Sequence, residues 1–126
     1  MISQQYASNA YMKTMVNTSV SKLDLVIMLY DGSVEFLMKA AFYMNQKDVA
    51  KKLLFMDKAM AIIEHLKATL NMEAGGEIAK QLHGLYSHML VELTLANIRN
   101  DAEKVKRVEK LLRTLREGWQ GIKNDH

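Results

Sequence analysis

The chain has 126 residues, a net charge of +3, no cysteine and no proline. A chain of this length forms one domain with a modest core, and the absence of cysteine excludes a disulfide framework, a thiolate metal site and a thiol nucleophile. The mild charge gives no argument for a nucleic-acid partner, and the lack of proline among many Ala, Leu, Met, Lys and Glu residues favours an all-α fold.

Residues 1–20 are rich in Ser, Asn, Gln and Thr, with Tyr6 and Tyr11 among scattered apolar side chains. This composition predicts a partly ordered N-terminal arm. The aromatic side chains favour docking of the arm on its own domain over a free arm. The beginning of the chain lacks the apolar segment of a signal peptide, and no apolar run approaches a membrane span. We therefore expect a cytoplasmic protein without membrane insertion.

The first helix is expected over residues 22–45, because Ser21 and Asp24 form a capping-box pattern. Its apolar side chains fall on two faces rather than one. One face holds Leu23, Ile27, Tyr30, Val34, Leu37 and Ala41, and the other holds Leu25, Leu29, Phe36, Ala40 and Tyr43. Gly32 lies in the middle of this helix, where we interpret it as the point of close approach by a neighbouring backbone.

A second helix is expected over residues 49–70, with Asp48 as its cap and one apolar stripe. The stripe holds Leu53, Met56, Met60, Ile63, Leu66 and Leu70, and we interpret Met56 and Met60 as core side chains. The segment 71–76 contains the pair Gly75 and Gly76, which predicts a loop.

The third helix, over residues 77–99, again carries more apolar surface than one stripe. Ile78, Leu82, Leu85, Met89, Leu93 and Ala96 form one face, while Tyr86, Leu90, Val91, Leu95 and Ile98 spread onto others. Asp101 caps a fourth helix over residues 102–122, which has one clean apolar face and a mixed-charge remainder.

Four helices with short connections predict an antiparallel, up-down-up-down four-helix bundle, with residues 1–126 forming a single domain. The first and third helices carry more apolar surface than such a bundle buries. This excess must meet another part of the chain, a second copy or a client protein. Because methionine adapts to apolar partners, Met28 and Met89 are candidates for a groove that takes an amphipathic helix.

Catalysis is not expected. No glutamate has a histidine three residues later, as di-iron bundles require, and His83 and His88 are too poorly spaced to share a metal. Neither Ser33 nor Ser87 has an identifiable base. The basic residues of the fourth helix alternate with glutamates, so nucleic-acid binding is not favoured either. No cofactor is predicted.

The chain resembles the FliS-type flagellar secretion chaperones. The resemblance is carried by Ser21 through Leu37 around Met28-Leu29-Tyr30-Asp31-Gly32, then by Leu70-Asn71, Gly75-Gly76-Glu77-Ile78-Ala79, Leu82, Leu85-Tyr86, Met89, Leu93 and Ala96-Asn97, and finally by Val108, Leu111-Leu112, Leu115-Arg116 and Trp119. It thus covers nearly the whole domain.

This resemblance implies a cytoplasmic chaperone that binds the C-terminal segment of flagellin, prevents premature polymerisation and delivers it to the flagellar type III export apparatus. Export gate components, a co-chaperone or an anti-sigma factor are further partners that it allows. The family's arm can occupy part of the binding surface, which makes Tyr6 and Tyr11 the expected anchors. The alternative is a self-associating structural or regulatory bundle.

The client site is expected on the first and third helices. Apolar surface predicts Leu25, Leu29, Phe36, Leu85, Met89 and Leu93 along or beside the groove. The family pattern adds Tyr30, Asp31, Gly32 and Asn97, each of which could equally be a packing or capping residue.

Overall fold

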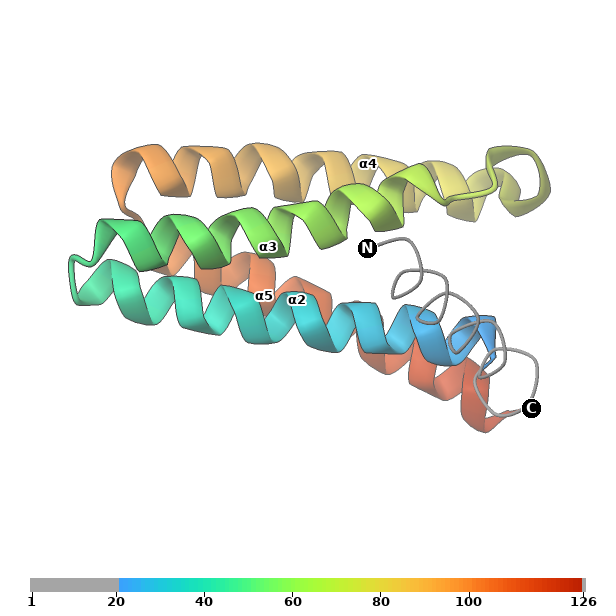
Figure 1. The fold of residues 1–126 in the computed structure, drawn as a ribbon. Coiled ribbons are helices and arrows are strands. Elements are labelled where there is room, and N and C mark those ends of the chain that lie inside the picture. Colours follow the sequence, from blue (N-terminus) through green and yellow to red (C-terminus); the bar gives the residue numbers. More distant parts are fainter. Residues whose placement is uncertain (1–20, 126) are drawn as a thin grey trace, which may run out of the picture.

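The computed structural model describes residues 21–125, so the predictions for the arm and for Tyr6 and Tyr11 fall outside the described part of the chain. Four long helices follow one another: α2 (Lys22–Asn45), α3 (Val49–Ala68), α4 (Met72–Arg99) and α5 (Ala102–Asn124). They run alternately up and down in a four-helix bundle (Figure 1). The all-α bundle predicted from the sequence is therefore confirmed.

Side-chain caps start the helices at well-defined residues. The Ser21 hydroxyl accepts a hydrogen bond from the Asp24 amide at 3.0 Å, and the Asp24 carboxylate accepts one from the Ser21 amide at 3.2 Å. The Asp48 and Asp101 side chains cap α3 and α5 by accepting hydrogen bonds from the Lys51 and Lys104 amides, each at 3.1 Å. Each cap satisfies a backbone amide that lacks a partner inside the helix, so the local sequence fixes where the helix begins.

The segment predicted to be the loop 71–76 is mostly helical instead. Asn71 caps a first turn of α4 by accepting a hydrogen bond from the Ala74 amide at 3.0 Å. The helix is interrupted only at Gly76, whose φ of 54° favours glycine. A Cβ at Gly75 would lie 2.6 Å from the Ala79 Cβ, so a larger residue would not fit there. The glycine pair therefore makes a kink rather than a loop.

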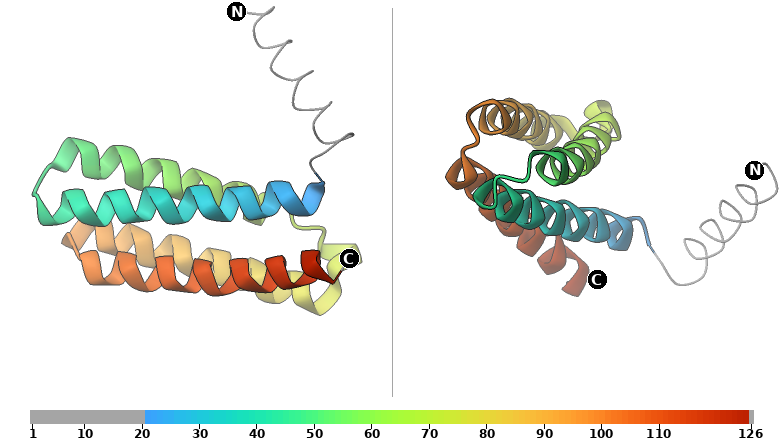
Figure 2. Two further views of the ribbon diagram at one scale, coloured as in Figure 1. Left: turned by 90° about the horizontal axis from the view of Figure 1, so that it is seen from below. Right: turned by 60° about the vertical axis from the view of Figure 1, so that its left-hand side comes forward.

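Helix α2 is the central element of the bundle. It packs extensively against α3 on one side and α5 on the other, whereas α4 packs less closely on α3 and α5 (Figure 2). The largest fully buried apolar side chains come from all four helices: Tyr30, Leu37, Met44, Met56, Ile63, Tyr86, Met89, Leu93, Val105 and Leu112. No helix within residues 21–125 combines the length and the apolar character that a membrane crossing requires.

One end of the bundle is tied by a buried lysine. The Lys52 ammonium on α3 donates to the backbone carbonyl of Asn97 at 3.2 Å and to the side chain of Asn100 at 3.3 Å. The Asn100 amide group in turn donates to the Met44 carbonyl at 3.2 Å. These hydrogen bonds join the ends of α2 and α4 to the start of α3, so α3 and α4 are held together at this end.

Candidate protein-binding groove between α3 and α4

Apolar side chains that the bundle does not bury line the edge where α3 meets α4. On α3, Leu53 and Met60 lie seven residues apart and therefore on one side of the helix. On α4, Val91 and Ile98 are also seven residues apart, and they remain 58% and 73% exposed. This α3–α4 edge therefore presents two parallel apolar stripes to the solvent.

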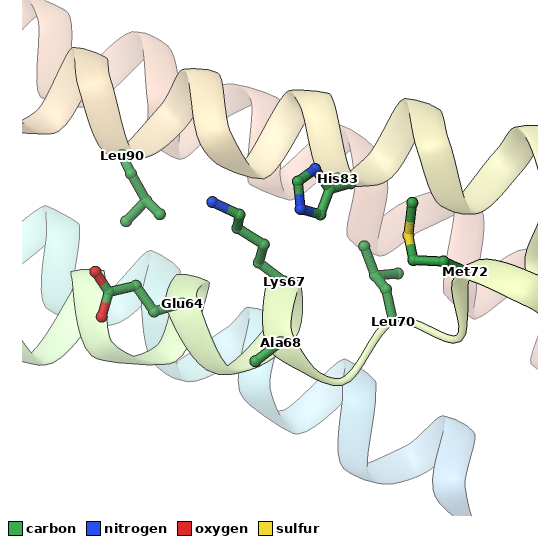
Figure 3. A pocket seen from close by; sticks show the side chains of 7 residues that line it. All are labelled: Glu64, Lys67, Ala68, Leu70, Met72, His83 and Leu90. Atoms are coloured by element: carbon green, nitrogen blue, oxygen red, sulfur yellow. The ribbon is translucent and has the colours of Figure 1, made fainter.

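The same edge is hollowed along its length. The first hollow is lined by Met60, Glu64, Leu90, Val91, Thr94 and Leu95. A second hollow of about 460 Å³ is lined by Glu64, Lys67, Ala68, Leu70, Met72, His83 and Leu90 (Figure 3). A third is lined by Leu70, Asn71, Ala74, Gly75, Ile78, Ala79, Leu82 and Trp119. Because neighbouring hollows share lining residues, they form one furrow, which we call the α3–α4 groove.

Polar side chains at the seam explain why the groove stays open. Lys67 lies seven residues after Met60 on α3, and His83 lies seven residues before Leu90 on α4, so each continues the apolar stripe of its helix. Burying either side chain without a partner would cost free energy. The two helices therefore do not close over each other at this level.

The structure divides the predicted client residues among several regions. Leu25, Leu29, Gly32 and Phe36 lie along the seam between α2 and α3, where Phe36 stacks on Phe55 with ring centroids 6.1 Å apart. A Cβ at Gly32 would lie 3.3 Å from the Ile62 side chain. Gly32 thus admits a neighbouring side chain and not, as predicted, a neighbouring backbone.

Three predicted groove residues lie in the core. Tyr30, Met89 and Leu93 are fully buried, so Met89 and Leu93 do not line a surface as predicted, and Tyr30 has the packing role that the family pattern left open. Burial of Tyr30 is possible because its hydroxyl lies 2.5 Å from the Tyr86 hydroxyl. The two groups form a hydrogen bond, so neither lacks a partner inside the bundle. Burial raises the pKa of both phenols, most strongly that of Tyr86.

The other predicted residues lie on different sides of the bundle. Asp31 forms an ion pair with Arg116 on α5. Leu85 lies two turns before Glu92, on the side of α4 where Glu92 pairs with Lys104 of α5 at 2.7 Å. Asn97 lies seven residues after Leu90 at the end of the groove, and its backbone carbonyl accepts a hydrogen bond from the Lys52 ammonium. Only Asn97 therefore lies next to the α3–α4 groove.

Several groove residues were not predicted as site residues. Met60 was interpreted as a core side chain, but it is only half-buried and lines the groove. Leu90, Val91 and Leu95 had been recognised as apolar surface outside the main stripe of their helix. The missing signal was the neighbour of that surface, because the groove is formed by α3 and α4 together, although α2 also exposes Met28, Met38 and Phe42.

Metal binding has no support in the described part of the chain. Between residues 21 and 125, no cluster of three His, Cys, Asp or Glu side chains could hold a metal ion. The groove offers apolar walls with one polar level at Glu64, Lys67 and His83. Such a surface fits an amphipathic helix of another protein.

Comparisons with known proteins agree over nearly the whole chain. The model of the family described as "Flagellar protein FliS" matches residues 3–126. The flagellar secretion chaperone FliS of Salmonella typhimurium is 41% identical over 117 residues, covering 90% of this chain and 87% of the relative. The flagellar secretion chaperone FliS of Campylobacter jejuni is 32% identical, covering 94% of this chain and 92% of the relative.

A solved structure supports the fold. A protein described as a flagellar chaperone from bacteria superposes with a TM-score of 0.79, covering 95% of this chain and 99% of its own. Its sequence identity is 18%, so this likeness concerns the architecture alone.

Proposed function

The chain belongs to the FliS family of flagellar secretion chaperones, and on that premise we propose that it holds the C-terminal segment of flagellin in the α3–α4 groove. In this proposal the chaperone works in the cytoplasm, keeps flagellin from polymerising early and brings it to the flagellar type III export apparatus. The family is one of chaperones, so the function is binding and not catalysis.

The observation that carries the proposal is the open groove, whose walls are apolar on either side of one polar level. On α4 beyond the kink at Gly76, the residues that line the three hollows run from Ile78 to Leu95, a length of about 25 Å at 1.5 Å per residue. A client helix of about four or five turns would match this length. Its apolar face would cover Val91 and Leu95, which otherwise remain in contact with water.

Adaptable side chains suit the groove to this task. Met60 and Met72 line two of its hollows, and unbranched methionines adjust to apolar surfaces of different shape. Ordering an unfolded client costs about 2–5 kcal/mol or more, so contact along most of the groove is needed for useful affinity. A short peptide would therefore bind weakly.

The N-terminal arm adds a regulatory element to the proposal, on the strength of the family resemblance. Tyr6 and Tyr11 would anchor the arm on the client surface in the absence of flagellin. A client then has to displace the arm, and its apparent affinity falls in proportion to the fraction of molecules that are open.

The test replaces Leu90, which lines two of the three hollows, with aspartate. Leu90→Asp places a charge among the apolar side chains that line the groove. Binding of the flagellin C-terminal segment should therefore weaken by about 30-fold or more. Titration calorimetry measures this effect, and circular dichroism verifies that the variant is folded. Leu54→Asp is the matched control, because Leu54 lies on the outward face of α3 and is 49% exposed.

Two results would overturn this placement. If Leu90→Asp binds normally while Leu29→Asp does not, the client lies on the seam between α2 and α3. If light scattering at micromolar concentration finds a tight dimer that Leu90→Asp dissociates, the groove serves self-association, which is the alternative function.

A further inference from the structure

The apolar stripes of α3 and α4 are interrupted at the same level. Lys67 on α3 and His83 on α4 line the same hollow, with Leu90 on one side and Leu70 and Met72 on the other. In Figure 3 the Lys67 side chain extends from α3 toward α4, and its end lies between Leu90 and His83 in this view. The groove thus has a polar level between two apolar ends, and we call its Lys67 and His83 side chains the cationic level; the Glu64 carboxylate lines the same hollow.

Lys67 has no counter-ion in the part of the chain that the structure describes. No carboxylate within residues 21–125 forms an ion pair with its ammonium group. Its side chain is half-buried along the wall of the hollow. In the free chain, water satisfies the part of this group that remains exposed.

A client in the groove would remove that water. Covering an ammonium group with an apolar face leaves a charge without solvent or partner, which is unfavourable. A carboxylate on the client would replace the water, because it accepts hydrogen bonds from the Lys67 ammonium and from a ring N–H of His83. The hollow therefore selects for an acidic side chain at one position of the client helix.

Resting on the function proposed above, we propose that the client inserts one Asp or Glu side chain between Lys67 and His83. Apolar client residues on either side of this carboxylate contact the two apolar ends of the groove. The apolar ends supply affinity, while the cationic level sets the register of the helix and rejects segments without an acid at that position.

Glu64 gives the proposal a sharp test. Its carboxylate lines the same hollow, one turn before Lys67, and it would repel a client carboxylate. If the client supplies the acid, Glu64→Gln should tighten binding roughly threefold. If Glu64 instead turns to neutralise Lys67 in the complex, the same variant weakens binding and the proposal is overturned.

The main experiment is a double-mutant cycle measured by titration calorimetry with the flagellin C-terminal segment as the probe. Lys67→Met keeps the length of the side chain but leaves the client carboxylate unpaired, so binding should weaken about tenfold or more. Lys110→Met on α5 is the matched control, because Lys110 is exposed and lies outside the groove. Each acidic residue of the segment is also replaced in turn by its amide.

One of those amide replacements should weaken binding to the unchanged chaperone but have no further effect on Lys67→Met. Normal binding by Lys67→Met, or the absence of any client acid coupled to it, would overturn the inference. In that case loss of binding in Leu90→Asp would still support the proposed function. Normal binding by Leu90→Asp would overturn both.

Discussion

The two edges of α3 differ in what fills them. Toward α2, Phe36, Phe55 and Tyr43 stack in a row, with centroid distances of 6.1 and 5.7 Å. The Lys39 ammonium lies 5.3 Å above the Phe55 ring and the Lys58 ammonium 5.5 Å above the Phe36 ring. Toward α4, further along α3, Glu64, Lys67 and His83 surround a hollow. Aromatic rings therefore fill the seam between α2 and α3, whereas charged and polar side chains leave the seam between α3 and α4 open.

This difference separates stability from binding on a single helix. The closed edge keeps its aromatic surface within the protein, where it contributes to folding. The open edge leaves apolar stripes in contact with water. Burial of this surface by a partner would stabilise the complex. Substitutions on the two edges should therefore act on different measurements.

The largest expected effect on stability comes from the closed edge. Phe55→Ala should lower the free energy of unfolding by about 2 kcal/mol, less than for a fully buried ring because Phe55 is partly exposed. Met60→Ala on the open edge should cost at most about 1 kcal/mol, because Met60 already faces a hollow. Denaturant unfolding measures both. Equal losses would mean that the two edges are packed alike.

Much of the fold followed from the sequence because it depends on local patterns. The capping pair Ser21 and Asp24 predicted where α2 begins, and the apolar repeat predicted Ile27, Tyr30, Val34, Leu37 and Ala41 on the buried face. At the start of α4, the glycine pair predicted a loop, whereas the Asn71 side chain caps an extra helical turn there. Local patterns thus predicted the elements better than their exact ends.

The site was harder to predict, for a physical reason. Periodicity assigns a side chain to one side of its helix, but the neighbour on that side depends on how the four helices are arranged in space. The sequence pattern allowed Tyr30 to be either a core or a surface residue. Its burial depends on a hydrogen-bond partner, the hydroxyl of Tyr86, which lies 56 positions further along the chain. The groove likewise needs α3 and α4 together.

A second prediction concerns the contact between α2 and α4 in the core, which helps to hold α4 in the bundle because the edge between α4 and α3 is open. The buried Tyr30–Tyr86 hydroxyl pair joins α2 to α4 across the core. Tyr86→Phe leaves the Tyr30 hydroxyl without this partner and should cost about 1–2 kcal/mol of stability. Thermal unfolding at pH 7 provides the measurement, and a neutral substitution would mean that the hydroxyl pair contributes nothing to the packing of α4.

The same pair predicts a dependence on alkaline pH. Burial raises the pKa of both phenols above the ordinary value of 10.0, so the folded state holds these protons more tightly than the unfolded state. Stability is therefore unchanged below about pH 10 and falls as the pH rises above it. The fall should be smaller in Tyr86→Phe, which has one buried phenol fewer. An equal fall in both proteins would contradict this assignment.

The smallest expected effect comes from closing the open edge. Leucine at both Glu64 and Lys67 would let the stripes of α3 and α4 meet, and stability should rise by about 1 kcal/mol. Client binding should fall in the same variant, because the groove is narrower and its cationic level is gone. Unfolding and titration on one preparation test both effects. A stability gain without a loss of binding would place the client elsewhere.

The most direct measurement uses the methionine methyl groups as reporters in a nuclear magnetic resonance titration with the flagellin C-terminal segment. Met60 and Met72 line the α3–α4 groove, whereas Met28 and Met38 are 57% and 50% exposed on α2. We expect the Met60 and Met72 resonances to shift while those of Met28 and Met38 stay in place. Shifts confined to Met28 and Met38 would contradict a client site between α3 and α4.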